Sequence, residues 1–203
     1  MKLVCLDLEG VLVPEIWIAF SQAVGIPQLE RTTRDEPDYN KLMTFRLDIL
    51  SKNNLRLRDI QKVIAGLEPL EGARAFVDEL RAKAQLIILS DTFEQFAMPL
   101  MKKLSYPTLF CNNLIVKPDG SVSGWKLRQQ NGKKEAVRAF QSCNIEVFAA
   151  GDSFNDLAMI EEAESGCLFR APDAIRSSYP KIPCVDDYSG LMSQIDRFLE
   201  KQE

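Results

Sequence analysis

Histidine is absent from the 203 residues of this chain, and its absence excludes several kinds of catalysis. Without an imidazole there is no Ser-His-Asp or Cys-His pair, no histidine ligand for zinc and no phosphohistidine intermediate. Any chemistry must therefore rely on carboxylates, lysines, hydroxyls, thiols or a bound ion.

Excess positive charge and long apolar runs are also missing. The chain has 25 Lys and Arg against 29 Asp and Glu, and its net charge is −4. Proteins that bind nucleic acid or anionic membranes through their charge carry a basic surface instead, and a helix that spans a bilayer needs roughly 18 consecutive apolar residues. The sequence therefore predicts neither a nucleic-acid partner nor a membrane partner.

Cysteine pairs at metal-binding or redox spacing are missing as well. The five cysteines are far apart, odd in number and never arranged as C-x-x-C, which argues against a disulfide framework and against a thiolate metal site. The first ten residues, MKLVCLDLEG, lack the apolar core of a signal peptide. We expect a reduced, cytoplasmic location.

Four short apolar runs, each ended by a polar residue or a glycine, predict buried parallel strands. Amphipathic helices separate most of them, and a turn at Pro118-Asp119-Gly120 predicts a small hairpin. This alternation favours an α/β fold with a doubly wound, mostly parallel sheet. The four runs are Leu3–Leu8, Gln85–Ser90, Thr108–Asn112 and Glu146–Ala150.

The segment from residue 14 to residue 68 interrupts the alternation, because it is mostly helical and contains no convincing strand. Since it follows the first strand directly, it would lie over the carboxyl ends of the strands, where open α/β sheets bind their ligands. We therefore predict a core domain of residues 1–13 and 69–203 and a helical cap domain of residues 14–68.

Acidic side chains follow two of the predicted strands. Asp7 and Glu9 end the first strand, and Asp152 and Asp156 follow the strand Glu146–Ala150. Three carboxylates at neighbouring strand ends repel one another unless a cation lies between them, and Mg²⁺ prefers such oxygen ligands. The alternative, in which Asp152 and Asp156 only cap a helix, leaves the coincidence with Asp7 unexplained.

A hydroxyl and a lysine complete a set suited to phosphoryl transfer. Ser90 ends the second predicted strand and Lys133 begins the helix before the strand Glu146–Ala150. A hydroxyl can donate to a phosphoryl oxygen and a lysine can neutralise its charge. Taken singly, Ser90 is compatible with a helix N-cap and Lys133 with a solvated helix start.

Together these motifs follow a known order: Asp-x-Glu, Ser, Lys and Gly-Asp-x-x-x-Asp. In this order the chain resembles the haloacid dehalogenase-like hydrolases along nearly its full length, and the helical insertion resembles the C1-type cap of their phosphoserine phosphatase branch. The resemblance implies a Rossmann-like core and Mg²⁺ as cofactor. It makes Asp7 the nucleophile and Glu9 the acid and base. The implied metal ligands are Asp7, the main-chain carbonyl of Glu9 and Asp152, with Asp156 contributing indirectly.

The same resemblance implies how the substrate binds. Ser90, Lys133 and the metal would bind the phosphoryl oxygens, and Asn155 would orient either these oxygens or Ser90. Glu15 and Arg46 match the residues that hold the amino and carboxylate groups of phosphoserine, although alone they would be a helix-start carboxylate and a surface cation.

Two departures from the family pattern narrow the resemblance. Glu9 replaces the usual second aspartate, and Asp91 and Thr92 replace two glycines beside the substrate. These features resemble most the bacterial bifunctional phosphoserine phosphatase/homoserine phosphotransferase group. That group implies L-phosphoserine as substrate and L-homoserine as a second acceptor, and a homodimer is compatible with it.

Three alternatives remain at this point. One is a phosphatase of the same family that acts on a different small phosphorylated metabolite, and it is favoured if neither Glu15 nor Arg46 faces the site. Another is a non-catalytic phosphate receiver, which needs neither a helical insertion nor Glu9. A dinucleotide-binding domain is disfavoured, because no G-x-G-x-x-G follows the first strand.

Overall fold

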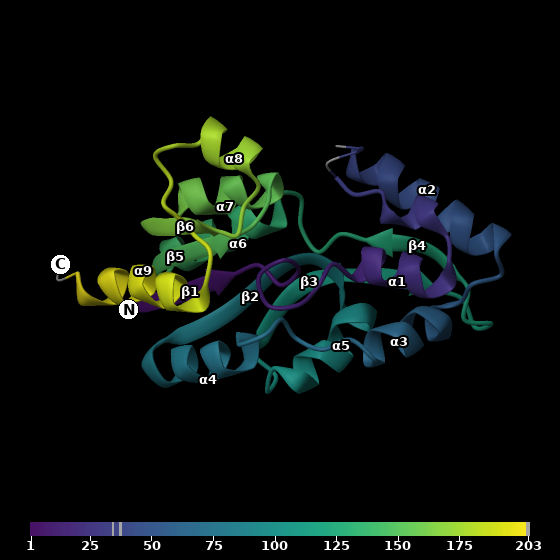
Figure 1. The fold of residues 1–203 in the computed structure, drawn as a ribbon, viewed down its shortest axis with the longest axis horizontal. Helices are drawn as coiled ribbons and strands as arrows, with labels where there is room; N and C mark the ends of the chain where they lie inside the picture. Colours follow the sequence, from purple (N-terminus) through teal and green to yellow (C-terminus); the bar gives the residue numbers. More distant parts are fainter. Residues whose placement is uncertain (34, 37, 202–203) are drawn as a thin grey trace.

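The computed structural model describes residues 1–33, 35–36 and 38–201 and contains a seven-stranded sheet (Figure 1). The strand order is β4-β3-β2-β1-β5-β6-β7, and every neighbouring pair is parallel except β3 and β4. The predicted α/β fold with a mostly parallel sheet is confirmed. The strands are β1 (Lys2–Leu6), β2 (Gln85–Phe93), β3 (Thr108–Val116), β4 (Val122–Lys126), β5 (Glu146–Gly151), β6 (Ser165–Phe169) and β7 (Cys184–Val185).

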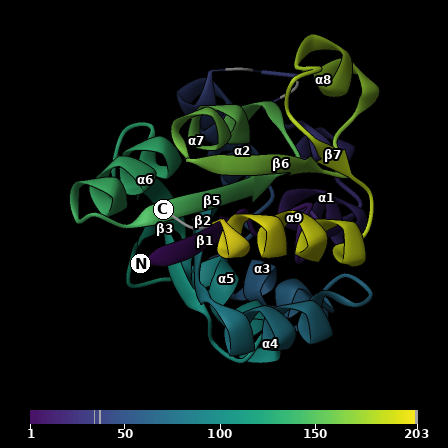
Figure 2. The same ribbon diagram turned by 90° about the vertical axis from the view of Figure 1, so that its left-hand side faces the viewer.

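Helices cover both faces of the sheet, as Figure 2 shows with α6 and α7 on one side and α4, α5 and α9 on the other. The α-helices are α1 (Ile16–Val24), α2 (Tyr39–Lys52), α3 (Leu57–Ala65), α4 (Ala73–Lys83), α5 (Glu94–Lys103), α6 (Gly132–Ser142), α7 (Leu157–Glu162), α8 (Asp173–Ser178) and α9 (Tyr188–Glu200). Two short 3₁₀ helices are η1 (Pro27–Glu30) and η2 (Phe154–Asp156). None of the helices within the described ranges is both long and apolar enough to cross a membrane.

The apolar runs supply two hydrophobic cores, one on each face of the sheet. Successive side chains of a strand point to opposite faces, so Val4 and Leu6 of β1 join the larger core while Leu3 and Cys5 join the smaller one. This burial on both faces explains why the predicted strands read as continuous apolar runs rather than as alternating patterns.

The strand order reverses at β1, which lies between β2 and β5. The chain first builds the sheet outward from β1 to β4 and then returns to the other side of β1 with β5. Ligand sites of open α/β sheets form at such reversals, outside the carboxyl ends of the strands. The residues that follow β1 and β5 are therefore placed where a site is expected.

Helices α1, α2 and α3 gather at one end of the molecule (Figure 1) and are tied to the hairpin of β3 and β4. The amide of Leu57 donates to the carbonyl of Gly120 at 3.0 Å, and the Arg56 guanidinium donates to the carbonyl of Asp119 at 2.7 Å. No strand is assigned among the described residues between β1 and α4, in agreement with the sequence analysis. The division into a core and a cap domain at residues 14 and 68 stays a prediction.

The structure corrects several strand boundaries. β1 ends at Leu6, before Asp7, whereas the apolar run predicts an end at Leu8; β2 continues past Ser90 to Phe93, and β3 continues to Val116. Strand β6 was not predicted, because its first residues, Ser165 and Gly166, do not resemble a strand. Gly166 is nevertheless required there, since a Cβ would lie 2.4 Å from the carbonyl oxygen of Ala149.

Tyr188, the first residue of α9, connects the end of the chain to the segment that follows β1. Its ring stacks on Phe76 and Phe169 at centroid distances of 4.9 and 5.0 Å, and its hydroxyl donates to the carbonyl of Val11 at 2.7 Å. Since Val11 is fully buried, water has little access to that carbonyl if the hydroxyl is removed.

We expect Tyr188→Phe to lower the free energy of unfolding by about 1–2 kcal/mol, because it leaves a buried carbonyl without its donor. Urea denaturation measures this change. The control is Tyr106→Phe, since Tyr106 is 58% exposed. Equal stability of the two variants would contradict the prediction.

Candidate active site

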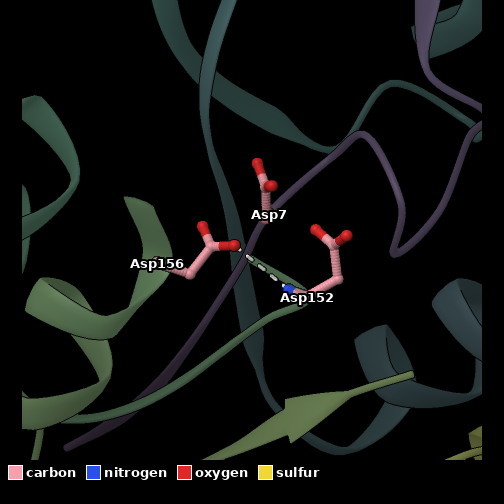
Figure 3. Close-up of side chains that lie close together, drawn as sticks. All are labelled: Asp7, Asp152 and Asp156. Atoms are coloured by element: carbon pink, nitrogen blue, oxygen red, sulfur yellow. Dashed lines mark hydrogen bonds between the residues drawn. The ribbon is translucent and has the colours of Figure 1, made fainter. Parts of the chain in front are cut away.

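Three buried carboxylates, those of Asp7, Asp152 and Asp156, meet at the strand reversal (Figure 3). Asp7 follows β1 and Asp152 follows β5, and the two strands are in register so that the amide of Asp7 donates to the carbonyl of Ala150 at 3.0 Å. One oxygen of each carboxylate lies within 4.8 Å of the others. The three carboxylates therefore converge at one edge of the sheet, as the sequence predicts.

Two glycines make this close approach possible. A Cβ on Gly10 would lie 2.5 Å from Cγ of Asp152, and a Cβ on Gly151 would lie 2.2 Å from Cγ of Asp156. Gly10 also has a φ of +76°, which other residues rarely adopt. Gly10 and Gly151 are therefore part of the site, because each leaves room for a carboxylate.

Lys133, in the first turn of α6, extends its ammonium into the carboxylate cluster. Nζ lies 2.6 Å from Asp156, 2.9 Å from Asp7 and 3.6 Å from Asp91, and the side chain is buried. Burial lowers the pKa of Lys133, but the carboxylates outweigh burial and raise this pKa well above its usual value. Lys133 is thus the charged partner of the cluster and not a solvated helix start.

One ammonium does not balance the three carboxylates. Burial, and next the charge of Asp156, raise the pKa of Asp7 well above its usual value. A buried excess of negative charge is stabilised by a cation. The donor set consists of oxygen atoms, and a hard cation such as Mg²⁺ fits it.

The hydrogen bonds of Asp156 show that its role differs from that of Asp7 and Asp152. Its Oδ1 accepts from Lys133, and its Oδ2 accepts from the amides of Asp152 and Ser153 and from the Ser153 hydroxyl. These bonds include the helix-capping arrangement considered as the alternative, so capping and ion pairing occur together. Because both oxygens have donors, Asp156 is better suited to orient the cluster than to bind a cation directly.

Glu9 points from the segment after β1 toward the start of α1. Its Oε2 accepts from the amide of Ile16 at 2.9 Å. Burial, and next the charge of Glu15, raise the pKa of Glu9 to about 7, although the hydrogen bonds from Ile16 and Thr92 act in the opposite direction. The longer side chain is therefore held in place and does not extend into solvent.

A cavity of about 100 Å³, named the inner cavity below, connects the carboxylate cluster to the helices α1 and α2. Every residue predicted for catalysis or substrate binding lines the inner cavity. Of the predicted metal ligands, Asp156 alone is not among the lining residues. The predicted residues that line it are Asp7, Glu9, Glu15, Arg46, Ser90, Asp91, Thr92, Lys133, Asp152 and Asn155.

Arg46 of α2 is buried and lines the inner cavity, so it is not the surface cation that the sequence alone would also allow. Its guanidinium lies 4.5 Å from the ring centroid of Trp17 and donates to the carbonyl of Arg31 at 2.7 Å. Within the described residues, Nε of Arg46 is a buried donor without a hydrogen-bond partner. Burial lowers the pKa of Arg46 to about 10. A buried cation with an unused donor is a suitable binding group for an anion.

The turn from Ser90 to Thr92 lies inside β2 rather than before a helix. Helix α5 begins at Glu94 with Phe93 as its N-cap, so Ser90 does not cap it. The Ser90 oxygen accepts from the amide of Thr92 at 3.2 Å, and the Asp91 carboxylate accepts from Asn155 at 2.9 Å. The hydroxyl, the carboxylate and the amide therefore lie around the same side of the inner cavity.

Several cavity residues were missed by sequence reasoning, among them Trp17, Tyr39 and Leu42. Tyr39, Leu42 and Arg46 are spaced i, i+3 and i+7, so they share one face of α2. This spacing is visible in the sequence, but it is also the spacing of ordinary helix packing. Trp17 belongs to the core of the helical segment and also contacts Arg46.

The fold and the site define an α/β protein with an acidic centre at the strand reversal of a parallel sheet. Residues 1–164 match the haloacid dehalogenase-like hydrolases, and the chain belongs to this family.

Relatives of known name are similar over most of the chain. It is 52% identical over 191 residues to phosphoserine phosphatase ThrH of Pseudomonas aeruginosa, covering 94% of this chain and 93% of the relative. It is 50% identical over 194 residues to a phosphoserine phosphatase of Pseudomonas syringae pv. tomato, covering 96% of this chain and 82% of the relative. A substrate-bound phosphoserine phosphatase structure has the same fold, with a TM-score of 0.75, 20% identity and coverage of 92% and 93%.

We expect Gly151→Ala to lower the free energy of unfolding by about 1–3 kcal/mol, because the added methyl overlaps Asp156 and forces the cluster apart. Urea denaturation measures the loss. Gly124→Ala is the matched control, since its Cβ would have no neighbour closer than 3.4 Å. A fully stable Gly151→Ala variant would show that Asp156 can move without cost.

Proposed function

We propose that this protein is a Mg²⁺-dependent phosphoserine phosphatase that acts through an aspartyl-phosphate on Asp7. The observation that carries the proposal is the inner cavity, which is lined both by the carboxylates and Lys133 and by Arg46. Two relatives that share about half of their residues with this chain are named phosphoserine phosphatases, which supports the same substrate.

In this mechanism an oxygen of Asp7 attacks the phosphorus atom in line with the serine oxygen, which leaves. Lys133 neutralises a phosphoryl oxygen, and its contact of 2.9 Å with Asp7 keeps it beside the attacking carboxylate. The Ser90 hydroxyl donates to a second oxygen. Bound Mg²⁺ supplies positive charge that stabilises the phosphoryl oxygens.

The residues suited to hold Mg²⁺ are Asp7, Asp152 and the main-chain carbonyl of Glu9. Asp156 orients them through the amide of Asp152 and through Lys133, to which it is hydrogen bonded. This division of roles follows from the hydrogen bonds of Asp156, which already occupy both of its oxygens.

Glu9 is suited to act as the general acid and base. It lines the inner cavity, and its hydrogen bond from the amide of Ile16 holds it near the start of α1, on the side where the leaving alcohol would lie in this mechanism. It would protonate the serine oxygen as that oxygen leaves and then accept a proton from the water that attacks the aspartyl-phosphate.

The amino-acid end of the substrate would be bound by Glu15 and Arg46. Glu15 offers a carboxylate for the ammonium group, and Arg46 offers its unused Nε donor for the carboxylate. Because both residues line the inner cavity, the alternative of a different phosphorylated metabolite loses the observation that would have favoured it. Helices α1–α3 and the placement of Glu9 also disfavour a non-catalytic receiver.

We also propose that L-homoserine can replace water as the acceptor of the phosphoryl group. Homoserine differs from serine by one methylene, which a pocket discriminates by only about 1–3 kcal/mol, and Glu15 and Arg46 would bind both. The glutamate at position 9, one methylene longer than the usual aspartate, favours a change in how the acceptor is activated. A cytoplasmic location and a homodimer stay predictions.

We expect the purified protein to release inorganic phosphate from L-phosphoserine in the presence of Mg²⁺, and to form phosphohomoserine when L-homoserine is added. Phosphorus NMR distinguishes the two products, and EDTA should abolish both. No phosphate release with Mg²⁺ would overturn the phosphatase, and phosphate release without phosphohomoserine would overturn the transfer alone.

In the same assay we expect Asp7→Asn to lower both activities by about 10³-fold or more. The control is Asp48→Asn, which changes an exposed carboxylate on α2 and should leave both activities unchanged.

We expect Arg46→Ala to lower kcat/KM for L-phosphoserine by about 10- to 100-fold, because a charged hydrogen bond to the substrate carboxylate is lost. O-phosphoethanolamine, which lacks that carboxylate, is the matched control substrate and should be affected little. Steady-state kinetics with both substrates give the comparison. Equal losses for the two substrates would show that Arg46 supports the fold rather than the carboxylate.

A further inference from the structure

A bulge in β2 leaves the Asp91 carbonyl outside the sheet. Leu89 pairs with Phe110 and Phe93 with Asn112, so β2 has two more residues than β3 over this stretch. The Asp91 carbonyl accepts instead from Nδ2 of Asn112 at 3.1 Å and from the hydroxyl of Tyr39 at 3.2 Å. Because Tyr39 begins α2, this second bond joins the helix that carries Arg46 to the turn that presents Ser90.

The side chain of Asp91 makes a second connection, to the 3₁₀ helix η2. Its Oδ2 accepts from Nδ2 of Asn155 in η2 at 2.9 Å. Tyr39, Asp91 and Asn155 thus form a hydrogen-bonded row, named the shared wall below. All three residues line the inner cavity and also an outer cavity of about 510 Å³, which extends over the residues from Leu127 to Lys134.

In the proposed function the inner cavity holds first an amino alcohol and then water. Its volume of about 100 Å³ exceeds the roughly 10–15 Å³ that one water needs. Once Asp7 carries the phosphoryl group, an alcohol that remains in the inner cavity can take the group back, whereas water can attack after the alcohol has left. The time for which the shared wall stays closed therefore affects the outcome.

We propose that the hydrogen bond from the Tyr39 hydroxyl to the Asp91 carbonyl is a latch that retains the alcohol in the inner cavity and thereby sets how the phosphoryl group divides between alcohols and water. This inference rests on the proposed function. In either outcome an acceptor oxygen bonds to phosphorus, the bond from phosphorus to the Asp7 oxygen breaks, and the acceptor proton passes to Glu9. When the acceptor is an alcohol, the product is a phosphate ester. When the acceptor is water, the product is inorganic phosphate.

Tyr39→Phe removes only the latch. The Asp91 carbonyl keeps its bond from Asn112, so no buried acceptor is left without a donor. The loss of one hydrogen bond shifts the balance between closed and open states by roughly 2- to 10-fold. We expect the ratio of alcohol transfer to hydrolysis to fall by the same factor.

The test supplies isotopically labelled L-serine together with unlabelled L-phosphoserine and Mg²⁺. Label that enters phosphoserine counts transfer to L-serine that has bound from solution and been retained in the inner cavity, and inorganic phosphate counts hydrolysis. The ratio does not depend on how much of the enzyme is folded, so it separates a latch from a general loss of structure. Tyr106→Phe, which removes an exposed hydroxyl outside both cavities, is the matched control.

A lower ratio in Tyr39→Phe, with the ratio of Tyr106→Phe equal to that of the wild type, supports the latch. An unchanged or higher ratio in Tyr39→Phe overturns it while leaving the phosphatase intact. Loss of both reactions in a folded Tyr39→Phe variant also overturns it, because a latch takes no part in bond making. A wild-type protein that releases no phosphate overturns the proposed function, and the latch with it.

Discussion

The ion pairs of Lys133 are the interaction on which the site depends. The lysine is on α6, whereas its partners Asp7 and Asp156 follow β1 and β5, so only the complete parallel sheet brings these groups together. Burial makes each charge costly on its own, so the loss of one partner would leave the others uncompensated. The same burial leaves negative charge in excess, which suits a centre that receives a cation and a phosphate group together.

The carboxylate cluster was predictable because parallel strands align their carboxyl ends. Once the apolar runs are assigned to neighbouring strands, Asp7 and Asp152 must lie at the same edge of the sheet. Lys133 and Ser90 are different, because a lysine at a helix start and a serine at a strand end occur in many proteins. Only their order relative to the aspartates, as a family motif, indicated that they belong to the site.

Other features depend on packing that no local pattern displays. Arg46 looks like a surface cation until Trp17 and the carbonyl of Arg31 are brought against it by folding. The β2 bulge arises because β2 has more residues than β3 between two paired positions. Strand β6 is not predicted because Gly166 weakens the strand pattern, although only a glycine leaves room for the carbonyl of Ala149 at this position. These features depend on contacts with residues distant in the sequence, so local sequence patterns do not predict them.

The attachment of the helical segment to the β3–β4 hairpin has a consequence for protein engineering. Surface turns that connect two strands are usually good places to insert a tag or a domain, because few contacts depend on them. Here the carbonyls of Asp119 and Gly120 accept hydrogen bonds from Arg56 and Leu57, so the turn is also an attachment point for α3. Lengthening this exposed turn would loosen the helices over the inner cavity, and a fusion is better placed elsewhere.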